Sequence, residues 1–542
     1  MPQPSRASYV ALMAGQTARP LQGHFNAVPV LHSNQPEEVT GPGILIATTP
    51  GSSYAVETGQ PLANATFTFQ GEFGAHIHHK YFPSNPARLG NHRDRGLLTL
   101  ATLLINPSNQ SVRIRFQQGA VRNSFEAPYL PNHLLGVKPL GPRPWNTGPG
   151  DATAVQMLRG RLDQRLPEEV VLPPGGRTVL FRTELPARGI ANGLLKGHSD
   201  GPFQMAVVAA EDPQSDQDLL AVLDRGVLAP GRIYLNRIAD IQNRTVFSRV
   251  GGVAIGDAYT ATLSHDLSSG PLHVPLTSTN RHHFGTREVQ VNGLASRMLD
   301  SSLDNVGTYG VRFDVDLNVI GSGPYELVLS HPTANGRPFT AFRGSIGITT
   351  REGYREVHVG LRSGESLSLA SLNLQPGVST PIRISLVYPA DSTPGHLLSV
   401  VPSSQLAMLQ ERERQLQLAR AAAEARAQAT PNAPPPLLEP EADLKLQPSE
   451  DPAFSPRLLP PEINQVRPAP ATKPKTQTRR PGAGPMAPLP LLPPPILTPP
   501  TLALPGLTPG LVSPQRMNQS LIERYRDAVE AQQELLKRLM GR

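Results

Sequence analysis

The chain has 542 residues, of which 17% are charged, 38% hydrophobic and 5% aromatic, with 59 prolines and 47 glycines. This length is enough for about two to four domains. The absence of cysteine excludes a disulfide framework, a Cys-ligated metal or iron–sulfur site and a thiol nucleophile. No stretch approaches the roughly 18 consecutive apolar residues of a membrane-spanning helix, so the sequence predicts no transmembrane segment.

The formal net charge of +7 comes from 50 basic and 43 acidic residues, and only seven of the basic residues are lysine. The densest basic cluster is Lys473 to Arg480, which contains no aromatic residue and lies inside a proline-rich tract. Nucleic-acid binding requires a basic face with interleaved aromatic side chains. We therefore expect no nucleic-acid partner, and either a solvated tail or contact with an acidic polymer such as a cell-wall polymer.

The start of the chain has no recognisable export signal. A secretory signal needs about 7–15 apolar residues after a basic start, and the apolar stretch from Tyr9 to Ala14 is shorter. Two explanations stay open: a cytoplasmic protein, or a start that lies upstream of Met1.

Residues 20–401 have the pattern of a mainly β protein. Apolar runs bounded by Pro, Gly, Asn and Asp recur throughout, and strict alternation at 112–116 and 311–317 predicts half-buried strands. Helical patterns are confined to 152–161 and 216–224. The predicted strands are 43–49, 65–71, 97–105, 112–117, 179–183, 203–209, 310–319, 325–330, 344–349, 357–361 and 382–388.

A weak internal duplication supports two immunoglobulin-like β-sandwich units. Each half has an early hairpin, at 104–114 and 317–329, and a later Leu-x-Pro-Gly-type turn into a strand, at 171–180 and 374–382. The predicted organisation is an N-terminal arm (1–23), sandwich unit 1 (24–215), a connector (216–244), sandwich unit 2 (245–401), a helix (402–430), a Pro-rich linker (431–515) and a C-terminal helix (516–542).

The composition changes sharply after residue 401. Between 431 and 514, 25 of 84 residues are proline, against 34 of the other 458. Such a segment cannot build a core and favours disordered, extended polyproline II. The preceding helix, from about Ser404 to Ala429, is rich in Ala, Gln, Glu and Arg, which are good helix formers.

The C-terminal helix, from about Leu521 to Met540, is predicted to be amphipathic. Ser520 and Glu523 form a capping box. Three heptads are marginally stable alone, so the helix docks on its own domain, on a partner, or on a second copy. The a/d spacing predicts partner-binding positions at Ile522, Tyr525, Val529, Leu536 and Leu539, with Gln532 at one further seam position.

The strongest candidate metal ligands are His76, His78 and His92, with His79 and Asp94 nearby. If 75–81 is a strand, His76 and His78 share one face, and two imidazoles with a third ligand could bind Zn, Cu or Ni. The alternative is a set of histidines at a strand end that hydrogen-bond to loops. The adjacent pair His282-His283 is a weaker candidate, because neighbouring strand residues face opposite ways.

Carboxylate pairs give the other candidates. Asp314 and Asp316 share a predicted strand face, which could bind calcium or perform acid–base chemistry on a glycan, or could simply face water. Glu37-Glu38 is a second pair, and Glu168-Glu169 is expected at a loop surface. Nucleophile and phosphate-loop motifs are absent, so we predict no catalytic residue and no cofactor. The single tryptophan, Trp145, could stack on a sugar or a partner, or fill a gap in the core.

Several short motifs follow one another in order over about residues 19–401, at 25–37, 69–73, 78–79, 158–161, 250–254 and 305–311. In their order and spacing they resemble a cyanobacterial family known as domain-of-unknown-function family 3370. The family has no established activity, so the resemblance implies no catalytic residues. Its members often look like exported proteins, which would imply a missing upstream signal.

These observations favour a non-enzymatic scaffold or binding protein of the cell envelope, whose tail reaches a partner or a second copy. Two alternatives remain: a glycan-acting or metal-dependent enzyme on a β-sandwich fold, and a soluble cytoplasmic interaction protein.

Overall fold

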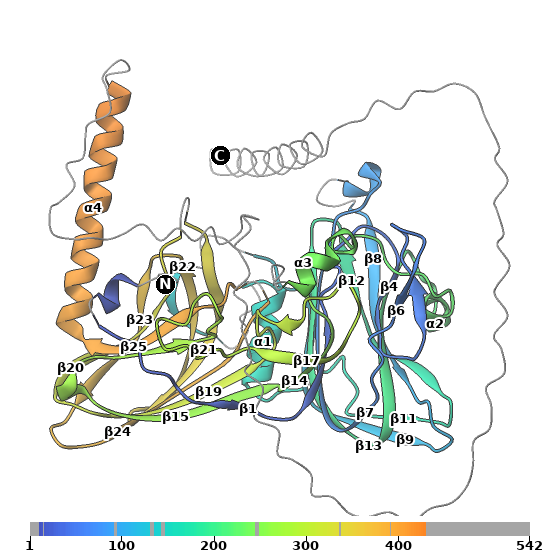
Figure 1. The fold of residues 1–542 in the computed structure, drawn as a ribbon, viewed down its shortest axis with the longest axis horizontal. Helices are drawn as coiled ribbons and strands as arrows, with labels where there is room; N and C mark the ends of the chain where they lie inside the picture. Colours follow the sequence, from blue (N-terminus) through green and yellow to red (C-terminus); the bar gives the residue numbers. More distant parts are fainter. Residues whose placement is uncertain are drawn as a thin grey trace, which may run out of the picture. The chain divides into compact units, whose positions relative to one another are not determined.

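The computed structural model describes residues 10–14, 16–90, 95–129, 135–141, 147–243, 249–334, 338–390 and 392–429. These residues all belong to one compact unit, Met1–Glu462. The Pro-rich linker, the C-terminal helix and Trp145 lie outside the described residues. The fold is mainly β, with several mixed sheets followed by a helix (Figure 1), which confirms the predicted class. The immunoglobulin-like arrangement of the strands stays a prediction.

Twelve strands form the largest sheet, called here the first β unit. Strand β13 (Ile190–Ala210) joins its two layers, because its first part pairs with β7 and β9 and its last part with β8 and β4. The rings of Phe69, Phe73 and Phe203 pack together in the core of this unit. Its other strands are β2 (Pro29–Ser33), β3 (Glu38–Val39), β4 (Gly43–Ala47), β7 (Phe69–Tyr81), β8 (Leu97–Ile105), β9 (Val112–Asn123), β11 (Glu169–Leu172), β12 (Arg177–Pro186), β14 (Gly251–Ile255), β17 (Asn292–Arg297) and β18 (Asp304–Asn305).

A seven-stranded and a four-stranded sheet enclose a separate core and form the second β unit. Strand β19 has the predicted alternation, since Phe313, Val315 and Leu317 are buried while Asp314 and Asp316 are half-exposed. In sheet order the seven strands are β1 (His24–Phe25), β15 (Ala258–Asp266), β19 (Arg312–Ile320), β24 (Thr380–Val387), β21 (Thr340–Thr350), β22 (Gly353–Arg362) and β10 (Gly136–Pro139). The four are β16 (Leu272–Leu276), β25 (His396–Pro402), β20 (Gly323–Ser330) and β23 (Ser366–Leu374).

Each β unit contains strands from both halves of the sequence. Strands β14, β17 and β18 follow residue 244 but extend the sheet of the first unit, through the pairing of β14 with β2. Conversely, β1 and β10 precede residue 215 but border the seven-stranded sheet. The sheets therefore do not follow the sequence boundaries at 24–215 and 245–401, because strand pairing depends on long-range partners as well as on local pattern. Strands β5 (Ser52–Tyr54) and β6 (Pro61–Ala63) form a separate hairpin.

The described helices begin and end close to the predicted positions. Helix α1 is Pro149–Leu158, and α2 is Asp216–Asp224, begun by a capping box between Ser215 and Asp218. Helix α4 is Ser403–Ala429. None of the helices in the described part of the chain is long and apolar enough to cross a bilayer. The short helices are α3 (Ile238–Gln242), η1 (Ala11–Met13), η2 (Pro86–Leu89), η4 (Leu235–Arg237) and η5 (Leu267–Ser269).

A fully buried ion pair fixes the connector between α2 and β14 to the first β unit. The Arg232 guanidinium donates to both carboxylate oxygens of Asp300 at 3.0 and 3.1 Å, and both side chains are 0% exposed. The same guanidinium donates to the carbonyl oxygen of Leu45 at 2.5 Å, while Gln35 donates to Asp300. A buried charge left without its partner is strongly unfavourable, so this pair ties three distant segments together.

We expect Asp300→Leu to lower the free energy of unfolding by about 3–5 kcal/mol, because it leaves the Arg232 charge buried without a counter-ion. The double variant Arg232→Met/Asp300→Leu should recover much of that loss, as measured by urea denaturation. The matched surface change, Asp316→Leu beside Arg383, should cost less than about 1 kcal/mol. Equal losses at Asp300 and Asp316 would contradict this assignment.

Candidate functional site

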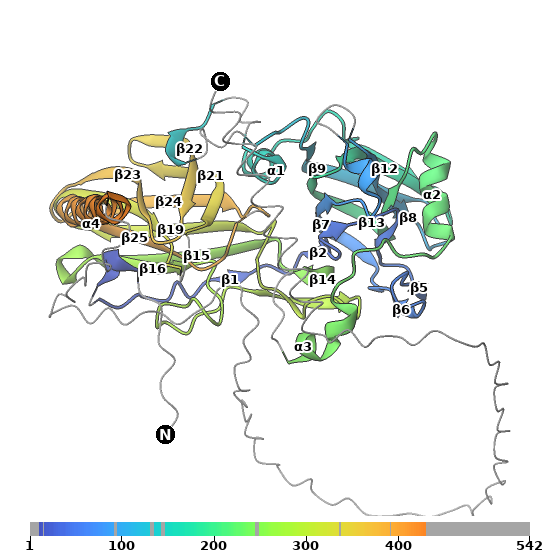
Figure 2. The same ribbon diagram turned by 90° about the horizontal axis from the view of Figure 1, so that it is seen from above.

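Helix α1 lies between the two β units and bonds to both (Figure 2). On the side of the first unit, Asn192 of β13 donates to the Thr153 hydroxyl at 2.5 Å. On the side of the second unit, the Asp151 carboxylate is 3.0 Å from the His358 Nδ1 atom and accepts from the Ser345 hydroxyl at 3.2 Å. These groups are buried, so α1 is a polar joint enclosed between two apolar cores.

The start of α1 is set by a glycine and a proline. Pro149 occupies the first helical position, where its fixed φ suits a helix and its missing N–H costs nothing. Gly148 has φ of 93°, and a Cβ there would lie 2.1 Å from the Tyr129 ring. The Arg343 guanidinium covers that ring at 4.4 Å from its centroid. The entry into α1 therefore has no room for a side chain.

The predicted histidine pair on β7 is connected to this joint through Asn192. His76 and His78 share a strand face, with their rings stacked at a centroid distance of 6.4 Å, and His78 Nδ1 is 3.0 Å from the Asn192 side-chain oxygen. His76 Nδ1 meets His32 Nδ1 at 3.3 Å. His79 faces the other way, with the Ser33 hydroxyl and the Pro36 carbonyl oxygen as partners. All are buried in the first β unit.

Burial keeps three of these imidazoles neutral. It lowers the pKa of His32 and of His79 to about 3, and the pKa of His76 is lowered well below its ordinary value by burial and then by the neighbouring histidines. Neutral imidazoles can bind metals, but His92, the third predicted ligand, lies outside the described residues. Within the described ranges, no group of three or more histidine or carboxylate side chains is arranged to hold a metal ion. The metal assignment of His76, His78 and His92 stays a prediction.

The other predicted pairs lie elsewhere. His282 and His283 lie between β16 and β17, and the His282 ring is 6.2 Å from that of His331. Asp314 receives bonds from Arg312 and Ser385, and Asp316 forms a bidentate pair with Arg383 at 2.7 and 2.8 Å.

The two glutamate pairs also meet cations. Glu169 bridges Arg113 and Arg115. Burial alone would raise the pKa of Glu37, but the charges of Lys80 and Arg249 prevail and lower it to about 2. These carboxylates are engaged in structural ion pairs.

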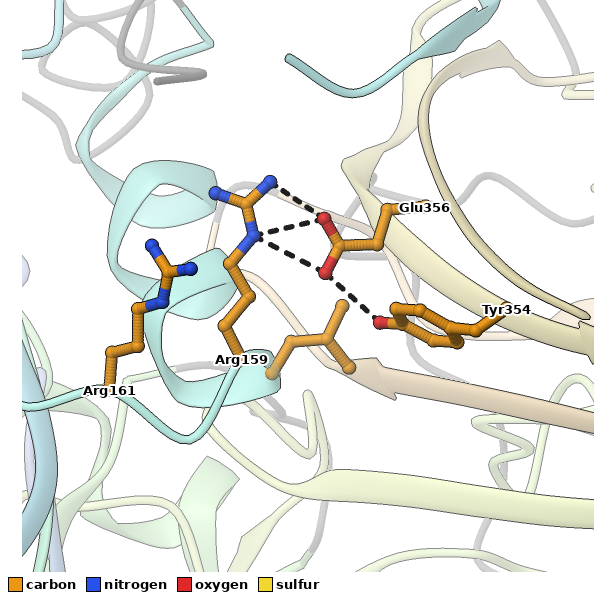
Figure 3. A pocket seen from close by; sticks show the side chains of 5 residues that line it. Arg159, Arg161, Tyr354 and Glu356 are labelled. Atoms are coloured by element: carbon orange, nitrogen blue, oxygen red, sulfur yellow. Dashed lines mark hydrogen bonds and ion pairs between the residues drawn. The ribbon is translucent and has the colours of Figure 1, made fainter. Parts of the chain in front are cut away.

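A groove of about 460 Å³ opens where the end of α1 meets β22. Its walls are Leu158, Arg159, Arg161, Tyr354 and Glu356 (Figure 3). Arg159 Nη2 lies 2.6 Å from one Glu356 oxygen, and the Arg159 Nε atom is 2.9 and 3.2 Å from the two oxygens. The Tyr354 hydroxyl donates to the same carboxylate at 3.0 Å.

The groove has one charge that no described residue neutralises. Arg159 compensates Glu356, and both are largely buried. Arg161 is exposed and has no side-chain partner within the described residues; Figure 3 shows no bond between Arg161 and the other side chains drawn there. Burial, followed by the bond to Glu356, raises the pKa of Tyr354 to about 12, so its phenol stays neutral. The groove thus combines a free guanidinium with an exposed, uncharged aromatic ring.

Sequence reasoning missed this groove because its two walls are far apart in the chain. Arg159 and Glu356 are separated by 197 positions. The segment 158–161 is predicted as the end of a helix and as one of the family-like motifs, and 354–356 precedes the predicted strand 357–361 and carries no signal of its own.

Comparison with known proteins gives a family without an assigned activity. A family model described as "Protein of unknown function (DUF3370)" matches residues 16–402. No curated protein matches the chain. A solved structure of a Paenibacillus xanthan lyase is 10% identical over 67% of this chain and 26% of that chain, with a TM-score of 0.12. At that score the likeness carries no argument about fold or function.

The buried histidines predict a specific acid sensitivity. The pKa of His79 is about 3 in the folded protein and near 6.5 when exposed, so below pH 6.5 the unfolded chain binds the extra proton. The stability that neutral His79 provides is complete above pH 6.5 and is lost as the pH falls toward 3, by ~1.4 kcal/mol per pH unit. His79→Gln should flatten the fall in unfolding free energy between pH 6.5 and 5, as measured by urea denaturation. The exposed His24→Gln control should keep the wild-type slope; an unchanged slope in His79→Gln would refute the prediction.

The joint at α1 can be tested separately. Asp151→Leu leaves His358 and Ser345 without their buried acceptor, so we expect a loss of about 2–3 kcal/mol of stability. Calorimetry should also show the two β units melting as separate transitions. Asp216→Ala, in the exposed first turn of α2, is the control and should change stability by less than about 1 kcal/mol. A single transition with unchanged midpoint in Asp151→Leu would contradict the role of the joint.

Proposed function

The chain belongs to the DUF3370 family, and on that premise we propose that it is a non-enzymatic scaffold or binding protein of the cell envelope. Its β body is made of two units that we take to be immunoglobulin-like. The body carries a tail that binds a protein partner or a second copy of the chain, and a cell-wall polymer is a further candidate contact of the protein. The tail consists of helix α4, the Pro-rich linker 431–515 and the predicted C-terminal helix 516–542.

The observation that carries this proposal is the way α4 leaves the body (Figure 1). Its beginning is anchored to the body: Leu406 is buried, the Gln405 side chain donates to the Leu12 carbonyl oxygen, and the Ser403 hydroxyl donates to Glu326. Farther along, Met408 and Leu416 are 68% and 50% exposed. The 27 residues of α4 extend for roughly 40 Å.

The composition of α4 suits a spacer that holds its shape without a partner. Its alanine, glutamate and arginine residues are strong helix formers, and Glu411 pairs with Arg414 at an i,i+3 spacing. A stiff helix followed by an extended proline-rich chain separates two attachment points. This arrangement supports a tethering function.

The side chains expected of an enzyme are engaged elsewhere. Asp314 and Asp316 neutralise arginines, and His76 and His78 are buried among hydrogen-bond partners. This supports the non-enzymatic proposal over a glycan-acting or metal-dependent enzyme. The resemblance to a family whose members often look like exported proteins favours the envelope, whereas a cytoplasmic interaction protein would use the same tail on an intracellular partner.

Deleting 516–542 should change the oligomeric state or the cell fraction of the protein, while the body still melts at the wild-type temperature. Light scattering after size exclusion and fractionation of cells would measure this. A finer variant, Ile522→Ser/Val529→Ser/Leu536→Ser, should have the same effect because it removes the apolar seam, and Glu523→Gln/Glu530→Gln is its matched control. Unchanged mass and unchanged fractionation in both the deletion and the seam variant would overturn the proposal.

A further inference from the structure

We propose that the groove between α1 and β22 binds an acidic polysaccharide, with Arg161 holding a carboxylate of the sugar and Tyr354 supporting a sugar ring. This inference rests on the proposed function as a binding protein, and it assigns the ligand class and the side chains that would recognise it.

The charge distribution points to an anion. Both oxygens of Glu356 already accept hydrogen bonds, from Arg159 and from Tyr354. A further carboxylate near this junction, Asp314, is held by Arg312, whose guanidinium also reaches the Leu158 carbonyl oxygen at 3.4 Å. Among the described residues that line the groove, Arg161 therefore supplies an uncompensated charge, and a guanidinium matches the geometry of a carboxylate by donating two parallel hydrogen bonds.

The aromatic side of the groove points to a sugar. Tyr354 is 57% exposed, yet the hydroxyl end of its ring is held in place. Its hydroxyl donates to Glu356, and its ring lies over Gly347, where a Cβ would come within 2.7 Å of the hydroxyl oxygen and 2.9 Å of the ring. A fixed aromatic ring with one free face offers an apolar surface at low entropic cost to the C–H groups of a pyranose.

The size and the openness to solvent agree with a polymer segment. The volume of about 460 Å³ lies within the usual range of ligand sites, roughly 300–1,000 Å³. The polar groups are few, and the ion pair between Arg159 and Glu356 holds these two side chains in place. A charged contact from Arg161 and a stacking contact from Tyr354 would together recognise an acidic sugar without requiring catalytic groups.

The test uses the full-length protein and defined oligosaccharides in isothermal titration calorimetry. We expect binding of hexagalacturonate at low salt, weakening as salt is raised, and no binding of neutral maltohexaose. Arg161→Gln should weaken binding by about tenfold or more, the effect of losing one charged hydrogen bond. Arg161→Lys should recover part of the affinity, and Tyr354→Ala should weaken binding where Tyr354→Phe does so less.

Arg225→Gln, an exposed arginine at the end of α2, is the matched control and should bind as wild type does. Thermal melts establish that each variant is folded. The proposal is overturned if wild type binds neither sugar, if Arg161→Gln binds as well as wild type, or if inorganic phosphate or monomeric galacturonate binds as tightly as the hexamer. If the groove does not bind the sugar, the proposed tethering function is unaffected, because these variants leave the tail intact. Likewise, if deleting the tail changes neither the oligomeric state nor the cell fraction, the proposed sugar binding by the groove is unaffected.

Discussion

The structure depends on a polar joint placed between two apolar cores. Asp151, at the start of α1, meets His358 and Ser345 of the second β unit, while Thr153, two residues farther along the helix, meets Asn192 of the first. Hydrophobic contact alone is not directional, but buried hydrogen bonds must be satisfied in one geometry. The joint therefore selects one docking of the two units and also places the end of α1, with Arg159 and Arg161, against β22.

The histidines and the groove illustrate two uses of polar groups in this fold. In the first β unit, His76 and His78 are sealed from water and have partners for part of their hydrogen-bonding capacity. At the rim of the joint, Arg161 is the opposite case, a full charge facing solvent. Buried polar groups contribute specificity of packing, whereas exposed charge beside a fixed aromatic ring contributes recognition, so the candidate site lies at the rim and not in the interior.

Local signals were sufficient for the elements whose ends are determined by neighbouring residues. The Ser215 capping box places α2 at the predicted 216–224, and the apolar run 97–105 is strand β8 in full. Strand β13 was predicted only at 203–209, because its first part contains Asn, Gly, Lys and His residues that become strand through pairing on both sides. The site depends even more on distant partners: Glu356 meets Arg159 only after the two β units have docked.

The route by which the tail leaves the body has a mechanical consequence. Strand β25 runs directly into α4 and lies between β16 and β20, paired antiparallel with both. A pull on the tail is therefore transmitted to a strand that is hydrogen-bonded on both sides, and not to a sheet edge that is held by a single row of hydrogen bonds. The described fold thus joins its tail to the body at a point suited to bear tension.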